Sequence, residues 1–297
     1  MQIVDAHHHL WDIEALSYPW LESEHAEAPY GDYRAIQRSY LIAEYLADTA
    51  HQSVVKSVHV QAEHDASDPV AETRWLQSIA DDPCSRGFPH GIVAHADFTS
   101  ADVERVLSAH HEYANIRGIR QILSHHTDPR LRQAAYDYLS DSRWRQRIGL
   151  LAKYGFSFDL QLYPHQMANG AALAAGHAGT LFVLNHAGTP AERDAAGLER
   201  WRQGMRQLAA CDNVVAKISG LGIFDPHWTV TSIRPFVLET IEIFGTERCM
   251  FASNFPVDKL FSDYDTLFAA YKTITAVCSE TEGRRLFHDN AVRYYRL

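Results

Sequence analysis

Short apolar or β-branched runs recur along the chain, and longer stretches with helical periodicity separate most of them. Eight such runs are candidate strands: 2–6, 54–61, 91–94, 116–122, 156–162, 181–185, 214–218 and 249–252. The stretches with helical spacing are 70–80, 101–113, 130–154, 198–210 and 264–277, followed by a C-terminal segment, 282–295. The pattern therefore predicts strands that alternate with helices.

This alternation indicates parallel βαβ units, because neighbouring parallel strands need a long crossover. Eight units favour a closed α/β barrel, the (β/α)8 TIM-type fold, over an open sheet with fewer strands. A dinucleotide-binding domain would carry GxGxxG after its first strand, and this sequence has none there. No low-complexity linker interrupts the chain. We therefore expect a single barrel domain spanning residues 1–297.

The connection after the first predicted strand, from residue 10 to about residue 53, is unusually long for a barrel loop. It contains Trp11, Tyr18 and Trp20, and ends in a helical stretch at 40–50. In a barrel this segment leaves the rim where active sites are built. It is either a binding loop over the site or a flap that covers an apolar face.

Composition excludes several classes of protein. The formal net charge is −10, and no basic run offsets it, so we expect no nucleic-acid partner. No uninterrupted apolar stretch is long enough for a membrane span. The four cysteines form no CxxC pair, and the N-terminal residues lack the features of a secretory signal. We expect a cytoplasmic protein with reduced thiols.

Histidines stand where two of the predicted strands end. His7 and His9 follow the first run and, two residues apart on a strand, point to the same side. His186 follows the sixth run at an equivalent height. Imidazoles gathered in this way can hold one metal ion or flank one substrate carbonyl. The alternative is that the HHH run consists of hydrogen-bonded residues at the barrel mouth.

Six segments in order carry a resemblance that covers essentially the whole chain: IVDAHHHLWD, IRGIRQIL, FDLQL, VLNHAGTP, CMFASNFPVDKL and FHDNAVRYYRL. Together they resemble the amidohydrolase superfamily, and within it the amidohydrolase-related (family 2) branch. That branch includes sugar lactonases of the L-fuconolactonase and L-rhamnonolactonase type. The resemblance implies a site at the barrel mouth that hydrolyses small esters, usually lactones.

The resemblance also implies a set of site residues. In metal-using members, an HxH pair, a His after the fifth strand, a His after the sixth and an Asp after the eighth form the site. Here His7, His9 and His186 match, whereas Gln161 and Asn254 stand at the two remaining positions. Two changes argue against a tight binuclear centre. Either one divalent metal, with zinc a candidate, sits on the three histidines, or the imidazoles work without metal as base and hydrogen-bond donors.

Further candidates lie near the predicted strand ends. The expected catalytic set is His7, His9, His186, Asn254 and Asp258. The expected substrate-binding set is Arg120, Gln121, Gln161, Lys217, Glu63 and Trp11, with Glu63 also an alternative base. An Arg at a strand end either grips a substrate carboxylate or pairs with a buried acid, and a Lys inside an apolar strand needs a partner.

We expect from these residues a hydrolase that opens a small lactone derived from a sugar acid or from ring cleavage. One alternative is a non-oxidative decarboxylase of a small aromatic or muconate-type acid on the same barrel. Another is a catalytically impaired barrel that only binds. The partner would be a small-molecule lactone or carboxylate, and neither the particular substrate nor the oligomeric state follows from the sequence.

Overall fold

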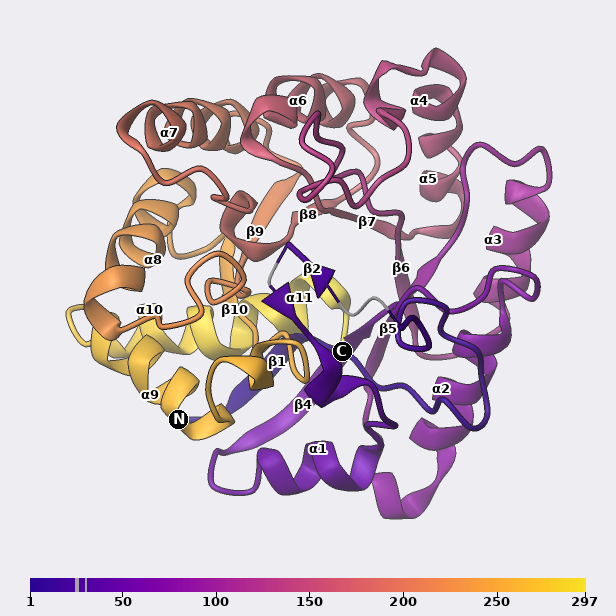
Figure 1. Cartoon of the computed structure of the whole chain (residues 1–297), viewed down its shortest axis with the longest axis horizontal. Coiled ribbons are helices and arrows are strands. Elements are labelled where there is room, and N and C mark those ends of the chain that lie inside the picture. The colour runs from indigo at the N-terminus through magenta and orange to yellow at the C-terminus, as the bar shows by residue number, and fades with distance from the viewer. Residues whose placement is uncertain (25–26, 30) are drawn as a thin grey trace.

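The computed structural model describes residues 1–24, 27–29 and 31–297. Eight parallel strands form its main sheet and are hydrogen-bonded in chain order. They are β1 (Ile3–His8), β4 (Val54–Val60), β5 (Gly91–His95), β6 (Ile116–Arg120), β7 (Ser157–Leu160), β8 (Phe182–Leu184), β9 (Val214–Ile218) and β10 (Cys249–Phe251). Figure 1 shows them as a ring surrounded by helices. The predicted TIM-type barrel is confirmed, and each predicted run overlaps one strand.

Helices fill the crossovers between the strands. They are α1 (Ile42–Asp48), α2 (Ala71–Asp81), α3 (Val103–His111), α4 (Ser142–Ile148), α5 (Leu151–Tyr154), α6 (Met167–Gly176), α7 (Ala195–Ala209), α8 (Val230–Phe244) and α9 (Tyr264–Ile274). The chain ends in α10 (Glu280–Arg284), a π-helical turn (Arg285–Asp289) and α11 (Asn290–Tyr295). Within the described ranges, no helix has the length and apolar character needed to cross a lipid bilayer.

The helix predicted over 130–154 is wrong in nearly its first half. Regular helix begins only at α4, where the Asp141 carboxylate caps the first turn by accepting from the backbone N–H of Arg143 at 2.8 Å. The preceding residues form an irregular loop that brings Gln133 to the barrel mouth. Helices α6 and α8 were not predicted; α6 is rich in Ala and Gly, which blurs its periodicity.

The barrel closes between its first and last strands through backbone bonds just past their ends. His8 and Phe255 form a parallel bridge. The N–H of Asn254 donates to the carbonyl of His7, and the N–H of His9 donates to that of Phe255, each at 2.7 Å. This closure brings residues from the two ends of the chain to one point of the rim.

The buried carboxylate of Asp5 reinforces the same closure. It accepts from the backbone N–H of Ser253 at 2.9 Å and from its hydroxyl at 2.6 Å. The hydroxyls of Tyr45 and Tyr264 donate to it at 3.1 and 3.2 Å. Burial raises the pKa of Asp5, whereas the bonds from Ser253 lower it. With the backbone N–H of His7, which donates at 3.3 Å, five donors satisfy this fully buried carboxylate.

The barrel interior is packed with small and branched side chains rather than left as a channel. It comprises Val4, Ala6, Val58, Val60, Val93, Val183, Val215, Met250 and Ala252, together with Ala291 and Tyr295 from α11. A second, larger apolar cluster lies between the strands and the helices. Among the described residues, the interior core fills the barrel beneath the mouth, so within the barrel a ligand has room at the rim.

The long connection after β1 contains a short hairpin, β2 (Glu27–Ala28) and β3 (Gly31–Asp32), which in Figure 1 lies across the barrel opening. A predicted helical stretch within it is α1. Trp20 and Tyr33 from this connection line the cavity at the mouth. The connection therefore contributes to the cavity wall, as the first of the two readings of this loop predicts. Residues 25, 26 and 30 of this loop lie outside the described part.

Gly118 is a point where two strands approach too closely for a side chain. A Cβ there would overlap the Ser157 hydroxyl and come within 2.9 Å of the Ser157 carbonyl oxygen. We expect Gly118→Ala to destabilise the fold by about 1–3 kcal/mol, the usual cost of overpacking. Urea denaturation measures this. Gly176→Ala is the control, because a Cβ at Gly176 meets nothing within 4 Å; equal stability of both variants would contradict the prediction.

Candidate active site

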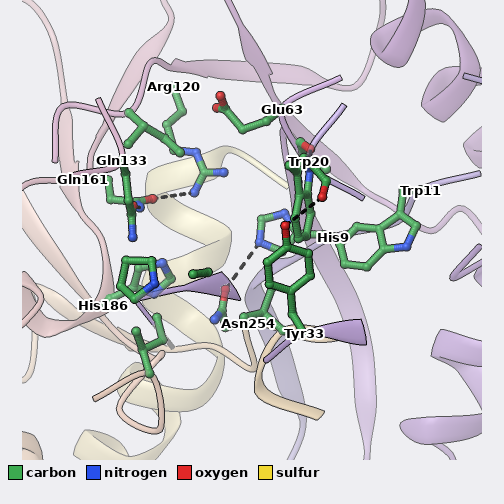
Figure 2. A pocket seen from close by; sticks show the side chains of 16 residues that line it. His9, Trp11, Trp20, Tyr33, Glu63, Arg120, Gln133, Gln161, His186 and Asn254 are labelled. Carbon is green, nitrogen blue, oxygen red and sulfur yellow. Dashed lines mark hydrogen bonds between the residues drawn. The ribbon is translucent and has the colours of Figure 1, made fainter. Parts of the chain in front are cut away.

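A cavity of about 340 Å³ opens at the barrel mouth. Side chains from the ends of several strands and from the loop after β1 surround it (Figure 2). Its wall consists of His9, Trp11, Trp20, Ala28, Pro29, Tyr33, Ala62, Glu63, Arg120, Ile122, Gln133, Gln161, His186, Ile223, Asn254 and Val257. This volume suits a small organic molecule.

The three predicted histidines lie together at this cavity. The Nε2 atoms of His7 and His9 are 3.2 Å apart. The ring centroids of His7 and His186 are 4.8 Å apart, and those of His7 and His9 4.9 Å. His9 and His186 are on the cavity wall, and His7, fully buried, lies between and behind them. Strand ends far apart in the sequence thus converge as predicted.

The contacts of the rings determine which nitrogens carry hydrogen. His9 Nδ1 lies 2.6 Å from the carbonyl oxygen of Val60, which only accepts, so the hydrogen of neutral His9 is on Nδ1. Its Nε2 is then an acceptor and receives a hydrogen from His7. His186 Nδ1 lies 3.0 Å from the hydroxyl oxygen of Ser219. That is the only hydrogen-bond partner of this hydroxyl among the described residues.

All three rings are kept neutral. Burial lowers the pKa of His7, His9 and His186 well below the ordinary histidine value. The positive charge of Arg120 lowers the pKa of each further, and that of Lys217 lowers those of His7 and His186. Neutral imidazoles can accept or donate a hydrogen bond according to their tautomer, which is the property that acid–base work requires.

Asn254 faces His9, and Asp258 stands behind it. The Asn254 Nδ2 group donates to Asp258 Oδ1 at 3.0 Å, which turns Asn254 Oδ1 toward His9 Nε2, 3.4 Å away. Burial raises the pKa of Asp258 to about 7. Asp258 is not on the cavity wall. We therefore assign it a positioning role rather than the direct catalytic role that the sequence suggested.

Three wall residues have left-handed backbone conformations that non-glycine residues seldom adopt. The φ angles are 57° at Glu63, 54° at His186 and 59° at Asn254. Asn and His tolerate this region better than most residues do. Strained backbone gathered around one cavity is typical of functional sites, because the fold there fixes side chains at some cost.

Arg120 and two glutamines form the side of the cavity next to β6 and β7. Arg120 donates from Nη1 to Gln161 Oε1 at 2.8 Å and from Nη2 to the Gln61 carbonyl at 2.6 Å. Gln161 Nε2 donates to Gln133 Oε1, also at 2.8 Å. Glu63 is exposed at the rim, where the Gln61 side chain bonds both its backbone N–H and its carboxylate.

Lys217 is completely buried beneath the histidines and has a partner. Its ammonium donates to Asp159 Oδ2 at 2.6 Å and lies 3.5 Å from His7 Nδ1. The hydroxyl of Tyr295 donates to Asp159 Oδ1 at 2.9 Å. Burial lowers the pKa of Lys217 to about 8, against the effect of Asp159, which raises it. Lys217 is off the cavity wall, so the expected contact with substrate is not supported by its position.

Gln121 is also misplaced by the sequence prediction. Its Oε1 accepts from Trp144 Nε1 at 2.7 Å and from the backbone N–H of Phe98 at 3.2 Å. Its Nε2 donates to Asp97 at 3.1 Å. Successive residues of a strand face opposite sides, so when Arg120 points into the barrel mouth, Gln121 points to the helix layer. The expected role of Gln121 in substrate binding is therefore corrected to a structural one.

Sequence reasoning missed several wall residues and one supporting residue. Trp20 and Tyr33 belong to the aromatic residues of the loop identified as unusual, but the sequence did not assign either of them to the site. Gln133 was hidden by the helix wrongly predicted over 130–154. Ser219, which the sequence presents as an ordinary turn residue, holds His186. Trp11, expected to bind substrate, is on the wall, with its Nε1 donating to the Arg38 carbonyl at 2.7 Å.

The histidines fit a metal ion only in part. Two nitrogens on one tetrahedral zinc are about 3.3 Å apart, close to the 3.2 Å between the Nε2 atoms of His7 and His9. Yet in the part of the chain that is described, no three His, Cys, Asp or Glu side chains are arranged to hold an ion. The Lys217 ammonium beside His7 also opposes a second cation there. His186 thus does not complete the three-histidine metal site.

Comparison with known proteins identifies the family of this chain. A family model described as amidohydrolase matches residues 4–297. The chain belongs to the amidohydrolase family. The predictions of this family and of an enzyme of hydrolase type are confirmed.

Individual relatives align along almost the whole chain. The uncharacterized protein y4mH of Sinorhizobium fredii is 46% identical over 99% of this chain and 98% of its own. L-fucono-1,5-lactonase of Burkholderia multivorans is 27% identical over 99% of this chain and 96% of its own. A crystal structure of an amidohydrolase from Burkholderia multivorans with bound zinc has a TM-score of 0.83 and 25% identity, and covers 100% of both chains.

The buried Lys217–Asp159 pair makes a stability prediction. Lys217→Met leaves the Asp159 carboxylate buried without its cation, which typically costs about 3–5 kcal/mol. The double variant Asp159→Asn/Lys217→Met removes both charges, so it should unfold at a higher urea concentration than Lys217→Met alone. Urea denaturation followed by circular dichroism provides the comparison. If the single and double variants are equally stable, the two charges are not coupled as described.

Proposed function

We propose that this protein hydrolyses a small lactone in the cavity at its barrel mouth. One observation carries the proposal: His9 Nε2 and Asn254 Oδ1 lie 3.4 Å apart on the cavity wall, and both are hydrogen-bond acceptors. Two acceptors at this spacing can hold one water molecule by its two hydrogens. The likeness to L-fucono-1,5-lactonase supports the same reaction.

The water is activated by His9. The Val60 carbonyl keeps the hydrogen of His9 on Nδ1, and Asp258 keeps the amide NH2 of Asn254 turned away. The water oxygen therefore points into the cavity, and His9 Nε2 takes a proton as the oxygen attacks the ester carbonyl. His7 competes for the same nitrogen from 3.2 Å, so it is a positioning residue that tunes this base.

His186 completes the reaction as a donor. We assign the hydroxyl hydrogen of Ser219 to the bond with His186 Nδ1, its one partner among the described residues, which places the ring hydrogen of His186 on Nε2. That N–H donates to the carbonyl oxygen as negative charge develops on it. When the ring C–O bond breaks, the leaving alkoxide takes the proton from His9. The product is a hydroxy acid, and no covalent enzyme intermediate forms.

We derive no step through a metal ion, because only two of the three imidazoles are placed as zinc ligands are. A lactone is already activated by its ring, so a positioned water, a base and an oxyanion donor suffice. The zinc in the Burkholderia multivorans amidohydrolase belongs to that protein.

His9→Gln tests the assigned base. We expect kcat/KM for lactone opening to fall about 10²–10⁴-fold, the usual contribution of a general base. A panel of γ- and δ-lactones, followed by acid release with a pH indicator, measures this. His165→Gln is the matched control, since His165 is exposed near the end of β7 but off the cavity wall.

Two outcomes would reject the assignment. Wild-type turnover in His9→Gln would show that another group is the base. If wild-type protein opens no lactone but releases CO2 from small aromatic acids, the decarboxylase alternative replaces hydrolysis.

Chelation tests the metal-free reading. After exhaustive dialysis against a chelator, we expect lactone turnover to persist while elemental analysis finds far less than one metal ion per chain. The reason is that the described donor set supplies two metal-binding imidazoles but no third ligand. A loss of activity that added zinc restores would instead establish a metal on His7 and His9.

A further inference from the structure

Arg120 is a buried cation without an acidic partner. Its side chain lies on the cavity wall, and the residue is only 4% exposed. Its hydrogen bonds go to a side-chain amide and a backbone carbonyl, both uncharged. Its Nε is buried without any partner. Among the described residues, no carboxylate comes within the 4.0 Å of an ion pair with it.

Lys217, the other buried cation of the site, has the acidic partner that Arg120 lacks. Lys217 meets the Asp159 carboxylate at 2.6 Å. Glu63, the acid whose charge acts most strongly on Arg120, is exposed at the rim and bonded to the Gln61 side chain. A neutral donor could make both of the bonds that Arg120 makes, without the cost of burying a charge. The positive charge is therefore unexplained by the protein alone.

We propose that Arg120 binds a carboxylate carried by the substrate, so that the lactone opened here is an acidic one. The inference rests on the proposed hydrolysis and narrows its substrate class. A guanidinium has five N–H donors in a fork that matches a carboxylate, and Arg120 has committed two to the protein. Gln161, held by Gln133, fixes the orientation of the fork.

The arrangement of the wall leaves room for both parts of such a molecule. Figure 2 shows Arg120 and Gln161 on one side of the cavity and the His9–Asn254 pair on another. The ester carbonyl would lie between His9 and His186, with the acid group reaching Arg120. L-fucono-1,5-lactone bears hydroxyl groups and no acid, so it would leave the charge of Arg120 unpaired. The preferred substrate should thus differ from that of the lactonase relative.

Two matched substrates test this on the wild-type protein. One is γ-butyrolactone with a carboxylate on the carbon next to the ring oxygen, and the other carries a hydroxymethyl group there. We expect kcat/KM to be about ten- to a hundredfold higher for the acid, the usual strength of a charge-assisted pair. Arg120→Met should reduce this ratio to near one. Arg117→Met is the control, because it removes the same charge from the start of the same strand.

Binding of tetrahydrofuran carboxylate, measured by calorimetry against tetrahydrofurfuryl alcohol, separates the two proposals. If the neutral lactone is opened as well as the acid, the acidic substrate class is refuted and hydrolysis stands. If neither lactone is opened but the carboxylate binds and the alcohol does not, hydrolysis is refuted and the anion site stands. If neither turnover nor binding occurs, both fail. These wild-type readings remain decisive if Arg120→Met does not fold.

Discussion

The site depends on the closure of the barrel between its first and last strands. His9 comes from the ninth residue of the chain and Asn254 from near its end, yet their side chains lie 3.4 Å apart. Two contacts hold them there. The backbone N–H of Asn254 donates to the His7 carbonyl, and Ser253 donates to the Asp5 carboxylate. Because Asp5 precedes the histidines on the same strand, the closure also fixes their height at the rim. The contacts that close the barrel therefore also position the side chains of the site.

The two buried cations of the site, Lys217 and Arg120, differ in how their partners offset the free-energy cost of burying a charge. Lys217 forms its ion pair with Asp159, and the hydroxyl of Tyr295 in α11 donates a hydrogen bond to the same carboxylate. Its charge serves the fold and lowers the pKa of His7. Arg120, by contrast, spends its bonds on neutral groups at the cavity wall. Lys217 has an acidic partner in the protein and Arg120 has none among the described residues, which indicates that the charge of Arg120 binds a ligand.

The sequence predicted the frame of this molecule well and the site in part. Strands were found because buried parallel strands read as short apolar runs, and the histidines because they stand directly at strand ends. Loop conformation was not predictable: the segment containing Gln133 was assigned to a helix because its spacing resembled one. The direction of Gln121 depended on knowing which of two adjacent residues points inward. The partner of Lys217 lies on another strand, so no local pattern reveals it.

The structure changes the interpretation of Asn254 more than that of the other candidate residues. As a replacement for the usual aspartate it looked like a loss, because an amide neither binds metal well nor takes a proton. In the structure the backbone there is left-handed, a conformation that Asn and Asp both accept, so the side chain can be exchanged without moving the chain. Asp258, four residues on, fixes the amide so that its oxygen faces His9. An uncharged acceptor beside a neutral imidazole adds no negative charge to the cavity wall, where Glu63 is the acidic side chain among the described residues. An aspartate in place of Asn254 would add a second negative charge to this wall and so weaken its attraction for a substrate carboxylate.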